Sequence, residues 1–155
     1  MENKEISPKD LWNDKKLEKV NVFISDHSKK QSDEQMIKNK LLSIQYKLED
    51  YIEKDDLKES EVLEILDFVK MYLEALSITK KDLANYFEMR DSNLHKYLTG
   101  QRKLNAEVVL KISTFSHTKP EYWYRVQMKN EIVKLKQERM RDYEKYDYRK
   151  MLASK

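Results

Sequence analysis

The chain has 155 residues, 39% of them hydrophobic and 38% charged, and its 31 basic and 28 acidic residues leave a net charge of +3. The length fits one domain with an appendage, and a 10% aromatic content can supply a core, which excludes a chain disordered throughout. One glycine and two prolines leave few turns for a β-sandwich or barrel, and the lack of cysteine excludes disulfides and thiolate chemistry. We therefore expect an all-α protein. Its small positive charge permits a polyanionic partner without requiring one.

The N-terminal region, residues 1–31, is polar apart from two short apolar stretches. These are Leu11–Trp12 and residues 20–25, where apolar and other residues partly alternate. Alternation permits a short strand, but no partner strand is evident, so we predict a flexible N-terminal arm and keep a paired strand as the alternative. The region has no apolar signal core, and no run approaches about 18 apolar residues, so we expect a soluble, cytoplasmic protein without a membrane partner.

An amphipathic helix is predicted for residues 32–58. Ser32 and Asp33 can cap its start. Its apolar residues follow alternating spacings of four and three over about two heptads, as in a coiled coil; they are Ile37, Leu41, Ile44, Leu48 and Tyr51. Such a stripe packs either on the rest of its own domain or on a second chain, as a dimer or partner interface.

Five further helices are expected in residues 59–135. The first starts at Ser60 and presents an apolar face as far as Leu76. The others are expected from about Lys80 to Glu88, Ser92 to Thr99, Asn105 to Phe115, and from Pro120, which suits the first position of a helix. The last helix becomes almost purely charged from Lys134 onward. We predict that residues 136–155 form a charged tail in which this helix frays and becomes disordered.

Residues 79–100 are predicted to form a helix-turn-helix, with the turn at Glu88–Arg90. Helical spacing turns the following residues inward: Leu83, Ala84, Phe87, Leu94, Tyr97 and Leu98. On the second helix Ser92, Lys96 and Thr99 then occupy the centre of the outward face, flanked by Asn93 and His95. Gly100, the only glycine, should end this helix in a left-handed conformation. Arg102 and Lys103 follow where a DNA backbone would pass.

The stretch TKKDLANYFEMRDSNLHKYLTG, residues 79–100, resembles the DNA-binding unit of the phage-repressor (Xre) family. Ala84 stands at the family's small residue, Leu94 at its buried aliphatic residue, and Gly100 six residues later. The next stretch, residues 104–127, resembles the segment that follows this unit in HigA-type antitoxins, with a Pro-Glu-x-Trp element and a glutamine: Pro120, Glu121, Trp123 and Gln127. The two matches together cover about residues 65 to 132.

By this resemblance, Lys80, Arg90, Arg102 and Lys103 are expected to contact DNA phosphates, and Ser92, Asn93 and Lys96 to contact bases or lie near them. Two positions depart from the family's pattern. Glu88 stands where the family usually has glycine, and Asp91 stands near the start of the recognition helix. Asp91 can cap that helix, but its carboxylate repels phosphate and accepts only from a base donor such as cytosine N4. Whether these two carboxylates abolish DNA binding stays open.

The resemblance implies an antitoxin of a HigBA-like toxin–antitoxin system. Such a protein neutralises a small ribonuclease toxin and, as a homodimer on double-stranded operator DNA, represses its own operon. The toxin would contact the N-terminal arm and the helix of residues 32–58. Two alternatives remain: a stand-alone Xre-family transcriptional regulator, and a protein-interaction module that has lost DNA binding.

Catalysis is not expected, and neither is a metal or another cofactor. The three histidines, His27, His95 and His117, have no second histidine or carboxylate at metal-ligand spacing. A glycine-rich phosphate loop needs more than one glycine. His117 falls where the family ends a helix with glycine, so we expect it to cap that helix.

Overall fold

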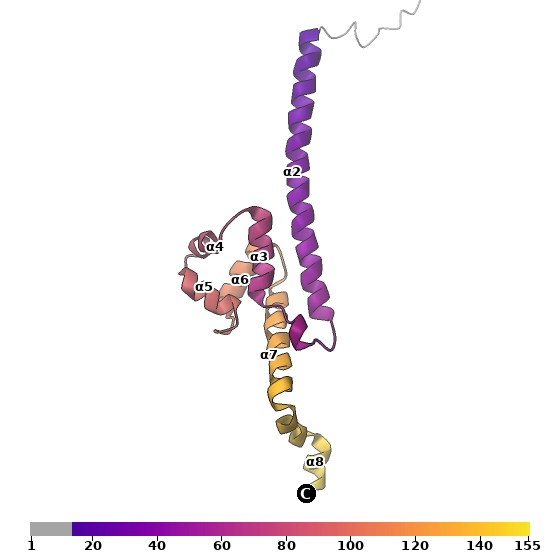
Figure 1. Ribbon diagram of the computed structural model, residues 1–155, viewed down its shortest axis with the longest axis vertical. Coiled ribbons are helices and arrows are strands. Elements are labelled where there is room, and N and C mark those ends of the chain that lie inside the picture. The colour runs from indigo at the N-terminus through magenta and orange to yellow at the C-terminus, as the bar shows by residue number, and fades with distance from the viewer. Residues whose placement is uncertain (1–13) are drawn as a thin grey trace, which may run out of the picture. The chain divides into compact units, whose positions relative to one another are not determined.

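The computed structural model describes residues 14–155, all of whose regular elements are helices (Figure 1). They are α2 (Asp14–Glu53), α3 (Ile65–Leu76), α4 (Lys80–Tyr86), α5 (Asp91–Leu98), α6 (Ala106–Ser116), α7 (Pro120–Tyr143) and α8 (Tyr148–Ala153), with 3-10 turns at Glu59–Glu61 and Glu144–Tyr146. The predicted all-α class is therefore confirmed. The chain divides into two units, Met1–Asn39 and Lys40–Lys155.

Helix α2 begins at Asp14, well before the predicted start at Ser32. The predicted arm is therefore wrong for residues 14–31, as is the strand considered for residues 20–25. Residues 1–13, including Leu11–Trp12, lie outside the described part of the chain. The physical reason for the longer helix is that no glycine or proline interrupts the chain between Pro8 and Gly100. None of the described side chains in residues 14–39 is buried.

The last part of α2, residues 40–53, packs within the second unit. Ile44, Leu48 and Tyr51 from the predicted stripe are buried there, with 6%, 0% and 5% of their surface exposed. Two contacts with α7 support this packing: the Tyr122 hydroxyl donates to a Glu49 carboxylate oxygen at 2.9 Å, and the Arg125 guanidinium lies 3.1 Å from the Glu53 carboxylate. Packing on its own domain is thus confirmed for this half of the stripe.

Helix α3 starts at Ile65 rather than at Ser60, so that predicted boundary is wrong. The Asp67 carboxylate accepts the Glu64 N–H at 2.8 Å and closes the first turn there. The preceding residue, Leu63, is held at both backbone groups: its N–H donates to the Tyr51 hydroxyl at 3.1 Å, and its carbonyl accepts from the Asn130 amide at 2.8 Å. These contacts fix the chain before α3 and leave Glu59–Glu61 as a separate turn.

The last part of α2 and helices α3 to α7 enclose the core, in which Trp123, Tyr72 and Phe68 are the largest fully buried side chains. The Trp123 indole N–H donates to the Thr118 hydroxyl at 2.9 Å, which satisfies its one polar group. Burial raises the pKa of the Tyr72 hydroxyl to about 12, and the nearby Glu49 carboxylate adds to the shift.

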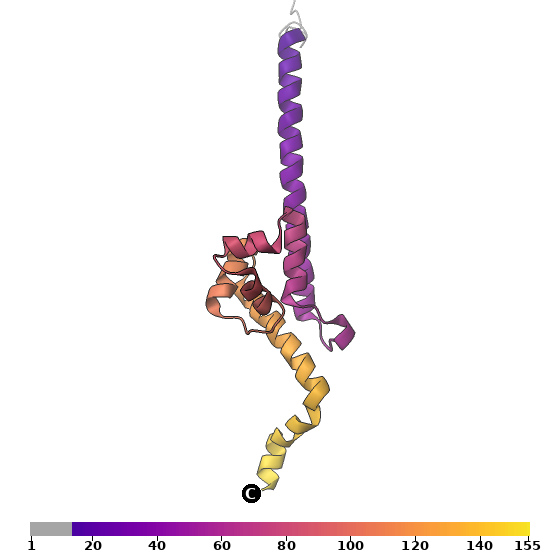
Figure 2. The ribbon, with the colours of Figure 1, turned by 60° about the vertical axis from the view of Figure 1, so that its left-hand side comes forward.

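The C-terminal region is helical instead of disordered, so that prediction is wrong (Figure 2). Helix α7 continues to Tyr143 with a break in helical geometry at Arg139, whose φ is −145°. Helix α8 follows a short turn, and the Asp147 carboxylate caps it by accepting the Arg149 N–H at 2.9 Å. No helix between residues 14 and 155 combines the length and the apolar character needed to cross a membrane.

Candidate nucleic-acid interface

Helix α4 has its start fixed by a reciprocal pair of side-chain caps. The Thr79 hydroxyl accepts the Asp82 N–H at 3.1 Å, and the Asp82 carboxylate accepts the Thr79 N–H at 2.9 Å and its hydroxyl at 2.7 Å. These hydrogen bonds hold the pKa of the Asp82 carboxyl below its ordinary value. The cap fixes the first turn of α4, in which Lys80 is the first helical residue.

The six residues predicted to face inward are all buried beneath α4 and α5. Their exposed fractions are 1% for Leu83, 0% for Ala84, 4% for Phe87, 0% for Leu94, 8% for Tyr97 and 1% for Leu98. A small side chain at Ala84 leaves room for close packing at that point. The predicted inward face of both helices is therefore confirmed.

The turn between α4 and α5 depends on a left-handed residue. Glu88 has a φ of +57°, a conformation that costs a residue with a β-carbon roughly 1–2 kcal/mol relative to the right-handed one. The Met89 N–H donates to the Ala84 carbonyl at 3.0 Å and closes the end of α4. Glu88 thus takes the backbone conformation that favours glycine.

Asp91 does not cap α5, because Arg90 occupies the cap position with an extended backbone and no side-chain hydrogen bond. Asp91 is instead the first helical residue. Its negative charge there interacts favourably with the positive end of the helix. The predicted capping role of Asp91 is corrected to a position in the first turn.

The end of α5 requires its glycine. Gly100 has a φ of +79°, as predicted, and the Arg102 N–H donates to the Lys96 carbonyl at 3.0 Å across the turn. A β-carbon at Gly100 would meet no heavy atom within 4 Å, so conformation rather than space calls for glycine. The Gln127 side chain of α7 accepts the Leu104 N–H at 2.6 Å and anchors the loop that carries Arg102 and Lys103.

The eight predicted DNA-contacting residues are all exposed or partly buried: Lys80, Arg90, Asp91, Ser92, Asn93, Lys96, Arg102 and Lys103. Several of them contact one another around α5. The Lys80 ammonium lies 2.9 Å from His95 Nδ1 and 3.8 Å from an Asp91 carboxylate oxygen. On the far side of the helix end, Arg102 Nη1 lies 2.5 Å from Asn93 Oδ1. Two of the predicted phosphate contacts are therefore also partners of α5 side chains.

His95 is not among the eight predicted DNA-contacting residues. It shares the outward side of α5 but is partly buried, and Lys80 reaches it from α4. Spacing alone could place it beside Lys96, but no sequence signal identifies Lys80 as its partner. That contact depends on how α4 and α5 cross.

Charge around α5 is moderately positive, since residues 79–103 contain six basic and three acidic side chains. The acidic side chains differ in their surroundings. Asp82 is engaged in the cap of α4, and Asp91 lies near Lys80. The third, Glu88, lines a groove that no residue of α5 lines.

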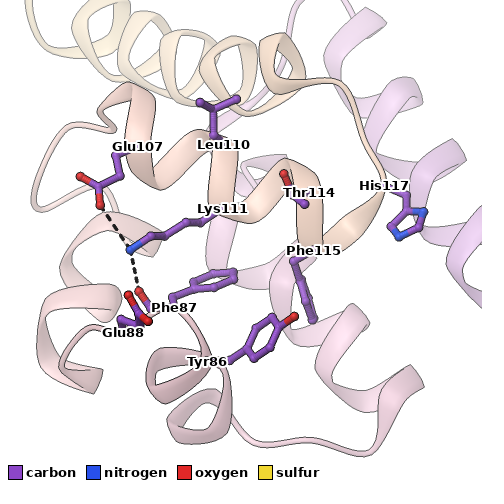
Figure 3. A pocket seen from close by; sticks show the side chains of 9 residues that line it. All are labelled: Tyr86, Phe87, Glu88, Glu107, Leu110, Lys111, Thr114, Phe115 and His117. Atoms are coloured by element: carbon purple, nitrogen blue, oxygen red, sulfur yellow. Dashed lines mark hydrogen bonds and ion pairs between the residues drawn. The ribbon is translucent and has the colours of Figure 1, made fainter.

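That groove lies between the end of α4 and helix α6 and has a volume of about 810 Å³ (Figure 3). Phe87 and Phe115 line its aromatic wall, and their rings pack edge to face with 5.9 Å between the ring centres. The Lys111 ammonium donates to the Phe87 carbonyl at 2.6 Å and lies 3.4 Å from the Glu107 carboxylate. At the end of α6, His117 has a φ of +54°, which confirms its predicted position as a helix cap.

The Pro-Glu-x-Trp element packs the start of α7 into the core. Pro120 occupies the first position of that helix, Trp123 is fully buried, and Glu121 is exposed. Together with the Gln127 contact to the loop after α5, this gives the element a structural role. Such a role suits an antitoxin and a stand-alone regulator equally well.

Within residues 14–155, no three His, Asp or Glu side chains cluster in a way that could bind a metal ion. Comparisons with protein-family models, with curated proteins and with solved structures found no match to this chain.

Proposed function

We propose that the protein binds double-stranded DNA, with the outer face of α5 in the major groove. One observation supports this most: the six residues predicted to face inward are buried, and polar and basic side chains surround the outer face of α5. The major groove of B-DNA, about 12 Å wide, admits an α-helix. The pair of helices then forms a helix-turn-helix, with α5 as its recognition helix.

In this proposal the side chains divide by their position. Ser92, Asn93 and Lys96 face the bases, while four basic side chains contact phosphates: Lys80, Arg90, Arg102 and Lys103. The Asp91 carboxylate lies near Lys80, whose positive charge offsets its repulsion of the backbone. A single such surface offers few phosphate contacts, so the protein binds as a homodimer on two half-sites.

The biological role that we propose is that of an antitoxin, a role supported by the resemblance to HigA-type proteins. A separate observation favours a protein partner: Leu17, Phe23 and Ile24 on α2 are 48%, 69% and 57% exposed. Exposed apolar side chains on one helix suit insertion into a groove of another protein. A small ribonuclease toxin is the partner that the resemblance implies.

DNA binding is tested by fluorescence anisotropy with labelled duplexes from the region upstream of the protein's own coding sequence. We expect affinity to fall steeply with salt concentration, and Lys96→Ala or Arg102→Ala to weaken binding about tenfold. Lys150→Ala on α8 removes the same charge away from α5 and is the matched control. Equal binding by all three variants would contradict the proposal, as would no binding to any duplex.

The protein partner is tested by purifying the tagged protein from its native cell and identifying co-purifying proteins by mass spectrometry. A small ribonuclease-like protein supports the antitoxin role, whereas DNA binding without a stable partner supports a stand-alone regulator. A stable partner without DNA binding supports an interaction module. For an antitoxin, deleting residues 1–31 should weaken neutralisation and leave DNA binding intact. The reverse result would refute this division of roles.

A further inference from the structure

Asn93 is held in one orientation by Arg102. The distance from Arg102 Nη1 to Asn93 Oδ1 is 2.5 Å, and a guanidinium carries donors only, so the atom that faces it must be the amide oxygen. The guanidinium itself lies over the Tyr97 ring, 5.4 Å from its centre, and the Tyr97 hydroxyl accepts from Asn105 at 3.2 Å. Arg102 thus uses one of the two lone pairs of that oxygen, and both amide N–H donors of Asn93 remain for a ligand.

The contact with Lys80 fixes the tautomer of His95. The Lys80 ammonium lies 2.9 Å from His95 Nδ1, and an ammonium group cannot accept a hydrogen bond. Nδ1 must therefore accept, and in the neutral ring the proton lies on Nε2. An Asp91 carboxylate oxygen lies 3.8 Å from the same ammonium. His95 thus has one free ring position, and it is a donor.

The outward side chains of α5 consequently offer mostly donors. His95 has its acceptor occupied, Lys96 has donors only, and Asn93 keeps both amide donors beside an oxygen that already accepts from Arg102. Asparagine reads adenine by accepting from N6 while donating to N7, and at Asn93 adenine N6 would have to share that oxygen with the guanidinium. Guanine presents two acceptors, O6 and N7, in the major groove and no donor on that edge. Asp91 is the acceptor-only side chain of α5, and cytosine N4, the donor of the same base pair, suits it.

We propose that the half-site read by α5 is a run of G·C base pairs, with guanine facing Asn93, His95 and Lys96. This inference rests on the proposed DNA binding and adds the class of sequence that is bound. Adenine is disfavoured at the position facing Asn93, because its N6 group would have to share the amide oxygen with the Arg102 guanidinium.

The test is selection from a pool of randomised duplexes, followed by affinity measurements on the selected sequence. Asn93→Asp keeps an oxygen for Arg102 and removes both amide donors at nearly constant shape, so it should lose the guanine preference at one position and bind about tenfold more weakly. His95→Phe keeps a ring and removes both ring nitrogens, and it should lose the preference at another position. Asn85→Asp makes the same charge change on α4 and is the matched control.

A second measurement needs no variant. Replacing guanine by 7-deazaguanine in the selected duplex removes the N7 acceptor and keeps base pairing, and we expect weaker binding by the unaltered protein. The inference is overturned, while DNA binding stands, if the unaltered protein selects A·T pairs at these positions or if Asn93→Asp keeps the guanine preference. An unaltered protein that retains no duplex from the pool overturns both proposals.

Discussion

Residues 14–39 and residues 40–155 are both helical, but for different physical reasons. In residues 40–155 short helices are bounded by caps and left-handed residues, and they bury the whole core of the described chain. In residues 14–39 no described side chain is buried, and the helix is continuous because no glycine or proline interrupts it. Burial and capping stabilise the first kind of helix, whereas the second has no buried described side chain and depends on local helix propensity.

The largest expected difference between the two regions is in the free energy of unfolding after a large side chain is truncated to alanine. Trp123→Ala should lower the free energy of unfolding by about 3–5 kcal/mol, because it leaves a cavity at a fully buried site. Phe23→Ala should change it by less than about 0.5 kcal/mol, because that ring is 69% exposed. Urea denaturation of the purified protein measures both. A comparable loss for Phe23→Ala would contradict the difference between the regions.

A smaller effect is expected from overfilling the core between α4 and α5. Ala84→Leu should cost about 1–3 kcal/mol, since Ala84 is fully buried and its neighbours leave no room for a larger side chain. Its neighbour Asn85 is exposed, and Asn85→Leu provides a matched control that should cost little. If the two variants melt at the same temperature, Ala84 does not lie at a close helix crossing.

At the two left-handed positions, replacing glycine should destabilise the protein and introducing glycine should stabilise it. Gly100→Ala should lower the free energy of unfolding by about 1 kcal/mol, and Glu88→Gly should raise it by up to about 1 kcal/mol. Both residues have positive φ, and Glu88→Ala, which keeps a β-carbon, should change stability little. Chemical denaturation of the three variants measures these differences. Changes of the same sign for Gly100→Ala and Glu88→Gly would contradict this account of the turns.

The smallest expected effect concerns the cap of α4. The Thr79 hydrogen bonds hold the pKa of the Asp82 carboxyl below its ordinary value, so its carboxylate stabilises the folded state above the unfolded-state pKa. This contribution disappears as pH falls through the lowered pKa. Asp82→Asn should therefore melt at a lower temperature than the unaltered protein near pH 7, and the difference should vanish in strong acid. A difference that is equal at both pH values would exclude the carboxylate as its cause.

Much of residues 40–155 could be predicted from the sequence, because helical spacing and glycine conformation are local properties. The buried positions from Leu83 to Leu98 follow from helical spacing, and the left-handed Gly100 follows from its lack of a β-carbon. Helix boundaries were less accurate: the start of α3 depends on Asp67 and on contacts with Tyr51. The early start of α2 was missed because polar composition was interpreted as disorder, although nothing in it breaks a helix.

Within the candidate site, the sequence predicted the outward face but not the contacts upon it. Ser92 and Lys96 follow from periodicity. The Lys80 contact with His95 joins two helices, and the Arg102 contact with Asn93 crosses the turn at Gly100. Both depend on tertiary geometry and on side-chain rotamers, which no local pattern determines.

The most direct test of the proposed DNA-binding surface is to titrate isotope-labelled protein with the selected duplex and to follow backbone amide shifts by NMR. The account predicts the largest changes in α5, at Lys80 and at residues 100–103, with little change in residues 14–39 or at the groove lined by Tyr86 and Leu110. Shifts concentrated in residues 14–39, or no shifts at all, would contradict it.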